Sequence, residues 1–211
     1  MQGSIYHNPK AHAISVEYPT YGLYTGKGVS ISETSIKNTA LSVYQTLTDK
    51  LGIVPEQIII FGRSMGSGPA CYLAHERPCA ALVLFAPFHS IKTVAKEHVG
   101  CLSCCAPNIF KNNEYIAKIA VPTVIIHGHR DNVINHSNSA SLYKASGATQ
   151  NDKTFVNPVA MSHNEFLMDS HLVQPVNTFL TNRKVIHNKA YKPIRFENIL
   201  RYDDTKDNMP D

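Results

Sequence analysis

The sequence predicts an α/β fold with a mostly parallel sheet and helices on both faces. Two continuous apolar runs, 80–85 and 122–127, lack polar alternation, which is typical of strands buried on both faces. A third apolar run, 57–61, leads directly into a glycine-rich segment and a helical pattern. Strands that alternate with helices in this way are typical of a doubly wound parallel sheet.

A short strand and a long helix are expected before the run 57–61. Residues 13–18 predict the strand, which the turn-forming residues 19–22 end. Ser30 and Glu33 have the spacing of a capping box, so a helix is expected to begin there and to close at Gly52. The apolar residues of this helix fall on one face: Ile36, Ala40, Val43, Tyr44, Leu47 and Leu51.

The remaining elements are expected in regular order. A helix runs from Ser67 to Glu76, because Pro78 stops it. Residues 88–119 predict an irregular segment that could fold over the strand ends as a lid. The last expected elements are a helix near 136–146, a strand near 153–158 and a helix near 165–181.

Length and composition predict one globular domain. The chain has 211 residues, enough for one well-packed core, and its composition indicates no second one. We expect residues 1–182 to form the domain, with a partial N-terminus. We expect residues 183–211 to form a tail that is partly disordered.

Charge and cysteine usage exclude several classes of function. The net charge of +4 is scattered, without a basic stripe that alternates with aromatic residues, which disfavours nucleic acid as a partner. No apolar run approaches the ~20 residues of a membrane span, and the first residues lack a signal pattern, so the cytoplasm is the expected location. Five cysteines, three of them at Cys101, Cys104 and Cys105, do not resemble a secreted disulfide framework, so reduced thiols are expected.

The segment Gly62-Arg63-Ser64-Met65-Gly66 has the pattern G-x-S-x-G between an apolar strand and a helix. This context is that of a nucleophile elbow, a tight turn that raises the serine hydroxyl above the sheet. Glycine is needed on both sides of the serine so that strand and helix can approach closely. Ser64 is therefore the candidate nucleophile.

A serine hydroxyl is a weak nucleophile at neutral pH, so Ser64 needs a histidine base and a carboxylate that orients the histidine. On this kind of fold the chain order is serine, acid, histidine. Asp131 lies just past the strand 122–127, and His163 lies between the last strand and the last helix. We predict the triad Ser64, Asp131 and His163, which needs no cofactor.

Two other patterns offer alternative interpretations. His127, His129 and Asp131 form an H-x-H-x-D pattern that could hold zinc, but Asn132 follows where a zinc hydrolase pattern would continue with histidine. The three clustered cysteines could be metal ligands or acylation sites. No partner pair at zinc spacing follows them, which favours plain thiols in the lid segment, and no metal is expected.

The chain resembles the α/β-hydrolase superfamily over residues 11–181. The motifs at 16–22, 62–66, 127–131 and 162–164 are similar to those of the α/β-hydrolase-domain-17 group. That group comprises membrane-associated serine hydrolases, some of which remove palmitate from protein cysteines. The resemblance implies an α/β-hydrolase fold, peripheral membrane association, and an acylated protein or a small ester as substrate. It also implies that the backbone N–H of Met65 is one donor of the oxyanion hole.

The sequence departs from this group at one point. Group members carry a His-Gly-Asn loop whose N–H is the second oxyanion donor, and this chain lacks it, as His7-Asn8-Pro9 follows no apolar strand. A truncated N-terminus is therefore expected, with the first strands absent and the second donor missing. Two alternatives to an ester or thioester hydrolase stay open: a serine peptidase of the prolyl-oligopeptidase type, and a catalytically inactive hydrolase-like protein.

Overall fold

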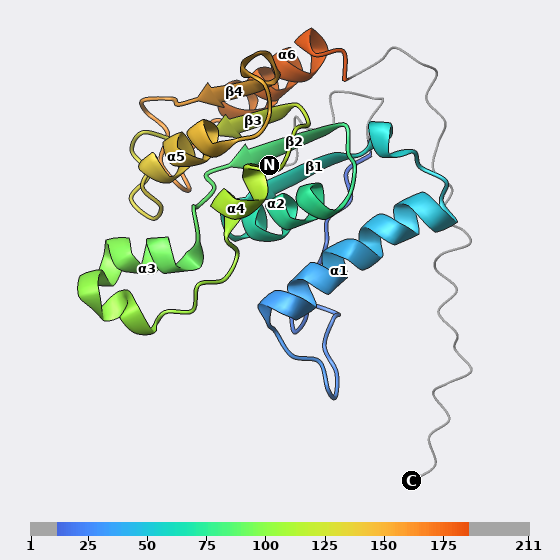
Figure 1. The fold of residues 1–211 in the computed structure, drawn as a ribbon, viewed down its shortest axis with the longest axis horizontal. Coiled ribbons are helices and arrows are strands. Elements are labelled where there is room, and N and C mark those ends of the chain that lie inside the picture. Colours follow the sequence, from blue (N-terminus) through green and yellow to red (C-terminus); the bar gives the residue numbers. More distant parts are fainter. Residues whose placement is uncertain (1–11, 186–211) are drawn as a thin grey trace.

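Four parallel strands form the sheet of the computed structural model, which describes residues 12–185. They are β1 (Ile59–Arg63), β2 (Ala81–Phe85), β3 (Thr123–Ile126) and β4 (Lys153–Val156), in the spatial order β1-β2-β3-β4. Neighbouring strands pair in parallel along the whole order. The predicted α/β class is therefore confirmed, and the carboxyl ends of all four strands lie at one edge of the sheet (Figure 1).

Six α-helices and several short helical turns connect and cover the strands. The α-helices are α1 (Glu33–Gln45), α2 (Ser67–Glu76), α3 (Ile91–Val99), α4 (Asn112–Ile116), α5 (Ser137–Ala145) and α6 (Gln174–Asn182) in the described part of the chain. Two π-helical turns extend α1 and precede α6, at Thr46–Lys50 and Met168–Val173. The 3-10 turns are Pro55–Gln57, Ser64–Gly66, Gly100–Cys105 and Gln150–Asp152.

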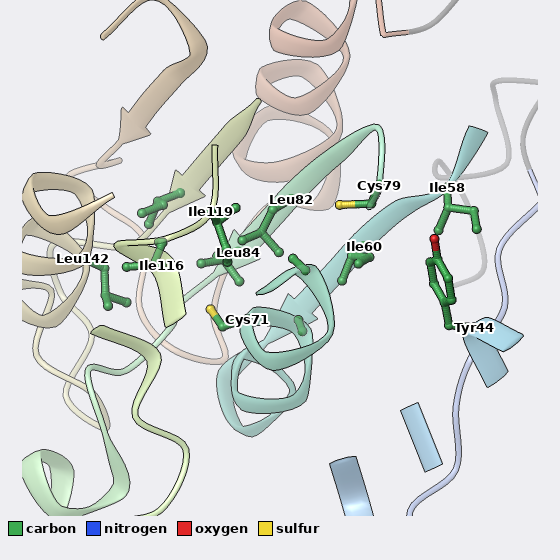
Figure 2. Close-up of a cluster of buried hydrophobic side chains, with 13 residues drawn as sticks. Tyr44, Ile58, Ile60, Cys71, Cys79, Leu82, Leu84, Ile116, Ile119 and Leu142 are labelled. Carbon is green, nitrogen blue, oxygen red and sulfur yellow. The ribbon is translucent and has the colours of Figure 1, made fainter. Parts of the chain in front are cut away.

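Both faces of the central strands are buried, as their continuous apolar sequence predicts. On one face, Leu82 and Leu84 pack with side chains from α1, α2, α4 and α5 (Figure 2). On the other face, Val83 and Phe85 pack with α6 and the turn before it. Alternate residues of one strand thus enter two separate apolar clusters, which is why polar residues cannot alternate in it.

Two cysteines belong to the first of these clusters. Cys71 of α2 and Cys79 before β2 are free thiols with almost no exposed surface (Figure 2). Burial raises the pKa of Cys79 to about 11 and raises that of Cys71 as well, so both remain protonated at neutral pH. They act as small apolar side chains in the core.

The prediction of a strand at 13–18 was wrong. These residues form no strand, and Ile14 and Val16 are 44% and 38% exposed. A strand exists only where a neighbouring strand accepts and donates its backbone hydrogen bonds. Among the described residues β1 pairs with β2 alone, so one edge of the sheet is open and 13–18 does not occupy it.

The start of the first helix also differs from the prediction. The capping box is formed by Ser32 and Ser35, which exchange hydrogen bonds, and not by Ser30 and Glu33. The Glu33 carboxylate instead accepts a hydrogen bond from the backbone N–H of Phe110 and pairs with Lys37. The side chain of Glu33, which the sequence predicted as part of the cap, thus makes a tertiary contact instead.

The segment 88–119 is not irregular, because α3, a 3-10 turn and α4 lie within it. Ser90 caps α3 by accepting a hydrogen bond from the N–H of Thr93. Figure 1 places α3 beyond the carboxyl ends of the strands. His98 and Glu97 of this helix contact the backbone of Val133 and Asn135, in the loop after β3. The interpretation of this segment as a lid stays a prediction.

Other boundaries shift by a few residues. β1 begins two residues after the start of the predicted run 57–61, and β4 ends two residues before position 158. The helix predicted near 165–181 begins as the π turn at Met168. The predicted helix from Ser67 to Glu76 is confirmed at both ends. Most of the predicted tail 183–211 lies outside the described residues.

Close packing of β1 on α2 depends on Gly62. A Cβ at this position would lie 2.6 Å from the Cβ of Ala70 and 2.6 Å from the carbonyl oxygen of Gly66. Backbone cannot yield as a flexible side chain can, so we expect Gly62→Ala to lower the free energy of unfolding by roughly 1–3 kcal/mol. Urea denaturation followed by circular dichroism measures this change.

Gly66→Ala is the matched control. The prediction that glycine is needed on both sides of Ser64 was wrong for Gly66. A Cβ there would meet only the Tyr18 hydroxyl, at 3.5 Å, and the backbone of Gly66 is right-handed helical. This variant should change the free energy of unfolding by less than about 1 kcal/mol. Equal effects of the two substitutions would contradict the packing argument.

Candidate active site

Ser64 lies in a strained turn between β1 and α2. Its φ is 50°, in the left-handed region that a residue with a side chain rarely adopts. The turn is a single 3-10 turn, Ser64–Gly66, that continues directly into α2. This is the predicted strand–turn–helix geometry of a nucleophile elbow.

Two buried side chains hold this turn in place through hydrogen bonds. The hydroxyl of Ser67 donates a hydrogen bond to the carbonyl oxygen of Ser64 at 2.7 Å. The side-chain amide of Asn112, from α4, donates to the Ser67 oxygen at 3.3 Å and to the carbonyl of Phe88 at 2.9 Å. Ser67 and Asn112 have no exposed surface. The strained backbone of Ser64 is therefore held by hydrogen bonds that do not exchange with water.

The structure brings together all three residues of the predicted triad. Ser64 Oγ lies 3.0 Å from His163 Nε2, and His163 Nδ1 lies 2.7 Å from Asp131 Oδ2. Ser64 follows β1, Asp131 follows β3 and His163 follows β4. Because these strands are parallel, their carboxyl ends converge at one edge, which is where sites form on such sheets.

Asp131 is a buried carboxylate with a full set of donors. The N–H groups of Val133 and Ile134 donate to Oδ1 at 2.9 and 2.8 Å, and the rings of His127 and His163 contact Oδ2. Burial alone would raise the pKa of Asp131. The hydrogen bonds from His127, Ile134, His163 and Val133 outweigh this effect and hold the pKa well below its usual range. The side chain is therefore ionised at neutral pH.

An ionised Asp131 determines which nitrogen of His163 carries the proton. The carboxylate can only accept, so Nδ1 carries the hydrogen and Nε2 is left with its lone pair toward Ser64 Oγ. In this tautomer the imidazole can take the proton of the serine hydroxyl. The arrangement is suited chemically to activating Ser64 as a nucleophile.

Arg63 is a site residue that the sequence did not reveal. Its Nη2 donates to the carbonyl oxygen of His163 at 2.8 Å and to the side-chain oxygen of Asn164 at 3.0 Å. The guanidinium also lies 5.4 Å from the ring centroid of Phe166. One side chain next to the nucleophile thus fastens the loop that carries the histidine. The contact spans about a hundred residues, and no local pattern signals it.

Met65 occupies the second position of the turn, with a side chain that is 46% exposed. Its backbone N–H follows Ser64 directly, as an oxyanion donor on this fold does. Its role stays a prediction. Within residues 12–185, no strand precedes α1, and no loop of the His-Gly-Asn type is present.

The H-x-H-x-D pattern does not converge on one point. His127 is completely buried beside Asp131, whereas His129 is exposed and its ring lies 4.4 Å from that of His136. In the described part of the chain, no group of three histidine, cysteine or acidic side chains is arranged to hold a metal ion. The side chain of Cys104 is exposed. None of the helices between residues 12 and 185 is long and apolar enough to cross a membrane.

Comparison with curated proteins finds related sequences, although no family model matches the chain. The chain is 33% identical over 133 residues to the alpha/beta hydrolase domain-containing protein aho-3 of Caenorhabditis elegans, a match that covers 63% of the chain and 39% of that protein. It is 34% identical over 124 residues to the human alpha/beta hydrolase domain-containing protein 17C, covering 57% of the chain and 37% of that protein. The chain thus spans about two fifths of the length of these relatives.

Comparison with solved structures finds the same fold at low sequence identity. The esterase domain of a Rhodothermus marinus protein superposes with a TM-score of 0.54 at 17% identity, covering 70% of this chain and 68% of that one. An acylaminoacyl peptidase of Pyrococcus horikoshii gives 0.55 at 15% identity, covering 79% of this chain and 30% of that one. The predicted α/β-hydrolase fold and the resemblance to the domain-17 group are therefore confirmed.

The low pKa of Asp131 predicts how stability depends on pH. Because the pKa is lower in the folded than in the unfolded chain, the ionised group stabilises the fold above the unfolded pKa of about 3.9, and this contribution is lost as the pH falls toward the folded pKa. We expect Asp131→Asn to lower the free energy of unfolding at pH 7 by roughly 1–3 kcal/mol. The difference from wild type should shrink as the pH falls from about 5 toward 3.

Urea denaturation at a series of pH values measures this difference. Asp49→Asn, which removes an exposed carboxylate on the turn after α1, is the control and should show no such trend. If the difference in the free energy of unfolding between wild type and Asp131→Asn stays constant from pH 7 to pH 3, that result would contradict the assignment of a buried, stabilised charge to Asp131.

Proposed function

We propose that the chain is a serine hydrolase that cleaves an ester or thioester through an acyl-enzyme on Ser64. One observation carries the proposal: the continuous hydrogen-bonded series from Ser64 Oγ to His163 Nε2 at 3.0 Å and from His163 Nδ1 to Asp131 Oδ2 at 2.7 Å. The buried, ionised acid and the strained nucleophile turn support the same function.

The proposed reaction has two halves. Ser64 Oγ attacks the carbonyl carbon of the substrate while its proton passes to His163 Nε2, and the oxygen of the tetrahedral intermediate accepts a hydrogen bond from the N–H of Met65. His163 then gives the proton to the departing alcohol or thiol, which leaves an acyl group on Ser64. Water attacks this acyl-enzyme with His163 again as the base, and the carboxylic acid is released.

Exposed apolar side chains support an apolar acyl group as substrate. Met65 directly follows the nucleophile, and Leu167 and Met168 follow the loop of His163. Their exposed fractions are 46%, 67% and 39%. Apolar surface of this kind gains free energy when a hydrocarbon chain covers it. We propose an acylated protein or a small ester as the substrate class, met at a cytoplasmic membrane surface to which the protein binds peripherally.

A fluorophosphonate probe tests the nucleophile without knowledge of the substrate. Ser64→Ala should abolish labelling, because the probe reacts only with an activated serine hydroxyl. Ser42→Ala, which removes an exposed hydroxyl from α1, should leave labelling unchanged. Labelling of wild type and Ser64→Ala at the same rate would sink the proposal. Turnover of peptide amides above that of matched esters would instead favour a peptidase.

Arg63→Ala tests whether the hydrogen bonds from Arg63 to the loop of His163 affect the reactivity of Ser64. Loss of the bonds to His163 and Asn164 should lower the rate of Ser64 labelling by roughly 10-fold to 100-fold, because small displacements of a catalytic base are costly. Guanidinium ion at millimolar concentration should restore part of the rate to Arg63→Ala.

Arg77→Ala, at a half-buried position directly after α2, is the control and should show neither the loss nor the rescue. An Arg63→Ala protein that is labelled at the wild-type rate would show that the loop of His163 keeps its position without the hydrogen bonds from Arg63.

A further inference from the structure

His127 is a buried polar side chain that the proposed reaction does not use. It directly follows β3, and no part of it is exposed to solvent. Its Nδ1 lies 2.6 Å from the hydroxyl oxygen of Ser139, and its Nε2 lies 3.1 Å from Asp131 Oδ2 and 2.9 Å from the carbonyl oxygen of Ile134. A buried imidazole that is fully hydrogen-bonded has a fixed orientation.

We propose that His127 is a positioning residue that donates from Nε2 to Oδ2 of Asp131, so that one carboxylate oxygen serves two imidazoles at once. The inference rests on the proposed function, because it assigns His127 a role in directing the acid toward His163. His127 touches neither the substrate nor Ser64, so its effect passes through Asp131.

The partners of His127 determine its protonation. Nε2 faces a carboxylate and a backbone carbonyl, and both can only accept, so Nε2 must carry a hydrogen. Its N–H is shared between the two oxygens, a three-centre arrangement. Nδ1 faces the Ser139 hydroxyl, which can donate to a bare nitrogen or accept from a protonated one. In either state of Nδ1, the bond to Asp131 is present.

The shared oxygen has a consequence for the base. His127 and His163 both donate to Oδ2, whereas the N–H groups of Val133 and Ile134 hold Oδ1. The carboxylate is therefore fixed at both oxygens, with Oδ2 directed at His163. The positive end of the His127 N–H also weakens the attraction of Oδ2 for a protonated His163.

Removal of His127 should therefore raise the pKa of His163. The direction is the same whether His127 is neutral or cationic, because its loss removes positive potential from beside Oδ2 in both cases. Other charged and ionisable side chains near this loop and its contacts are Arg63, Glu97, His98, Arg130, His129 and His136. They are the same in wild type and in the test variants, apart from His129 in the control.

The first test uses the wild-type chain and no substrate. Long-range ¹⁵N–¹H NMR spectra distinguish the two ring nitrogens of each histidine, and His127→Gln identifies the His127 signals by their disappearance. We expect His127 to carry a hydrogen on Nε2 at every pH at which the chain is folded. A His127 that is protonated on Nδ1 alone could not donate to Asp131, and this result would overturn the proposal.

The second test uses NMR titration to compare the pKa of His163 in the wild type with that in three variants. His127→Phe with Ser139→Ala removes the imidazole together with the hydroxyl that pairs with its Nδ1, so no buried hydroxyl is left unpaired. Asp131 Oδ2 and the carbonyl oxygen of Ile134 each lose one donor. This double variant should raise the pKa of His163 by roughly 0.5 to 1 pH unit. His127→Gln places an amide N–H near the position of Nε2 and should stay close to wild type. The exposed His129→Gln is the matched control and should not differ.

The rate of Ser64 labelling as a function of pH gives a parallel readout. In the double variant, the pH at which the labelling rate falls on the acidic side of this profile should rise by the same amount. A purely structural role would lower the rate without changing that pH. An unchanged or lowered pKa of His163 in the folded double variant would overturn the proposal. If that variant does not fold, the tautomer of His127 decides.

The two proposals fail in different ways. Absence of labelling in the wild type would argue against the proposed function, while both NMR measurements would still report on His127. Normal labelling together with an unchanged pKa of His163 in the double variant would leave the proposed serine hydrolase function standing and would contradict the positioning role of His127.

Discussion

The left-handed backbone of Ser64 is the constraint on which the rest of the site depends. A residue with a side chain adopts φ near 50° only when its surroundings impose it, at a cost of the order of 1–3 kcal/mol. Here the surroundings are close packing at Gly62 and the buried bonds of Ser67 and Asn112. They turn the hydroxyl of Ser64 toward His163, so that Ser64 Oγ lies 3.0 Å from His163 Nε2.

The second requirement of the site is that the buried negative charge of Asp131 be stabilised. Burial of a carboxylate without partners is unfavourable by several kcal/mol, and Asp131 avoids that cost because N–H groups satisfy both of its oxygens. Two of these donors are N–H groups of its own loop, one is the ring of His127 four residues before it, and one is the ring of His163 from the loop after β4. The same bonds that keep Asp131 ionised also fix its direction. The electrostatics of the acid and the geometry of the base therefore have one origin.

Much of this arrangement could be predicted from the sequence, and the parts that could not depend on contacts distant in the chain. The elbow, the buried strands and the helix from Ser67 to Glu76 are written in local patterns of glycine, proline and apolar runs. The strand at 13–18 was predicted from its β-favouring residues, but pairing decides whether a strand forms, and no described strand pairs with it. Arg63 was visible only as a member of the elbow pattern. The H-x-H-x-D pattern pointed to His127, but as a possible metal ligand, because sequence does not tell which way a side chain turns.

The open edge of β1 separates two contributions to catalysis that usually occur together. The side chains of Ile59 and Phe61 are 39% and 49% exposed, so this strand is covered less than its neighbours. The bonds among Ser64, His163 and Asp131 nonetheless lie on turns after β1, β3 and β4, all within the paired and packed part of the sheet. The hydrogen bonds among these three residues therefore form without a strand at the open edge. Stabilisation of the oxyanion is a different matter, because a site with one donor in place of two loses about 10²-fold to 10³-fold in turnover. Under the proposed function, labelling of Ser64 by a probe reports on the bonds among Ser64, His163 and Asp131, whereas ester turnover depends on the oxyanion donors as well. The two measurements therefore report on different halves of the same site.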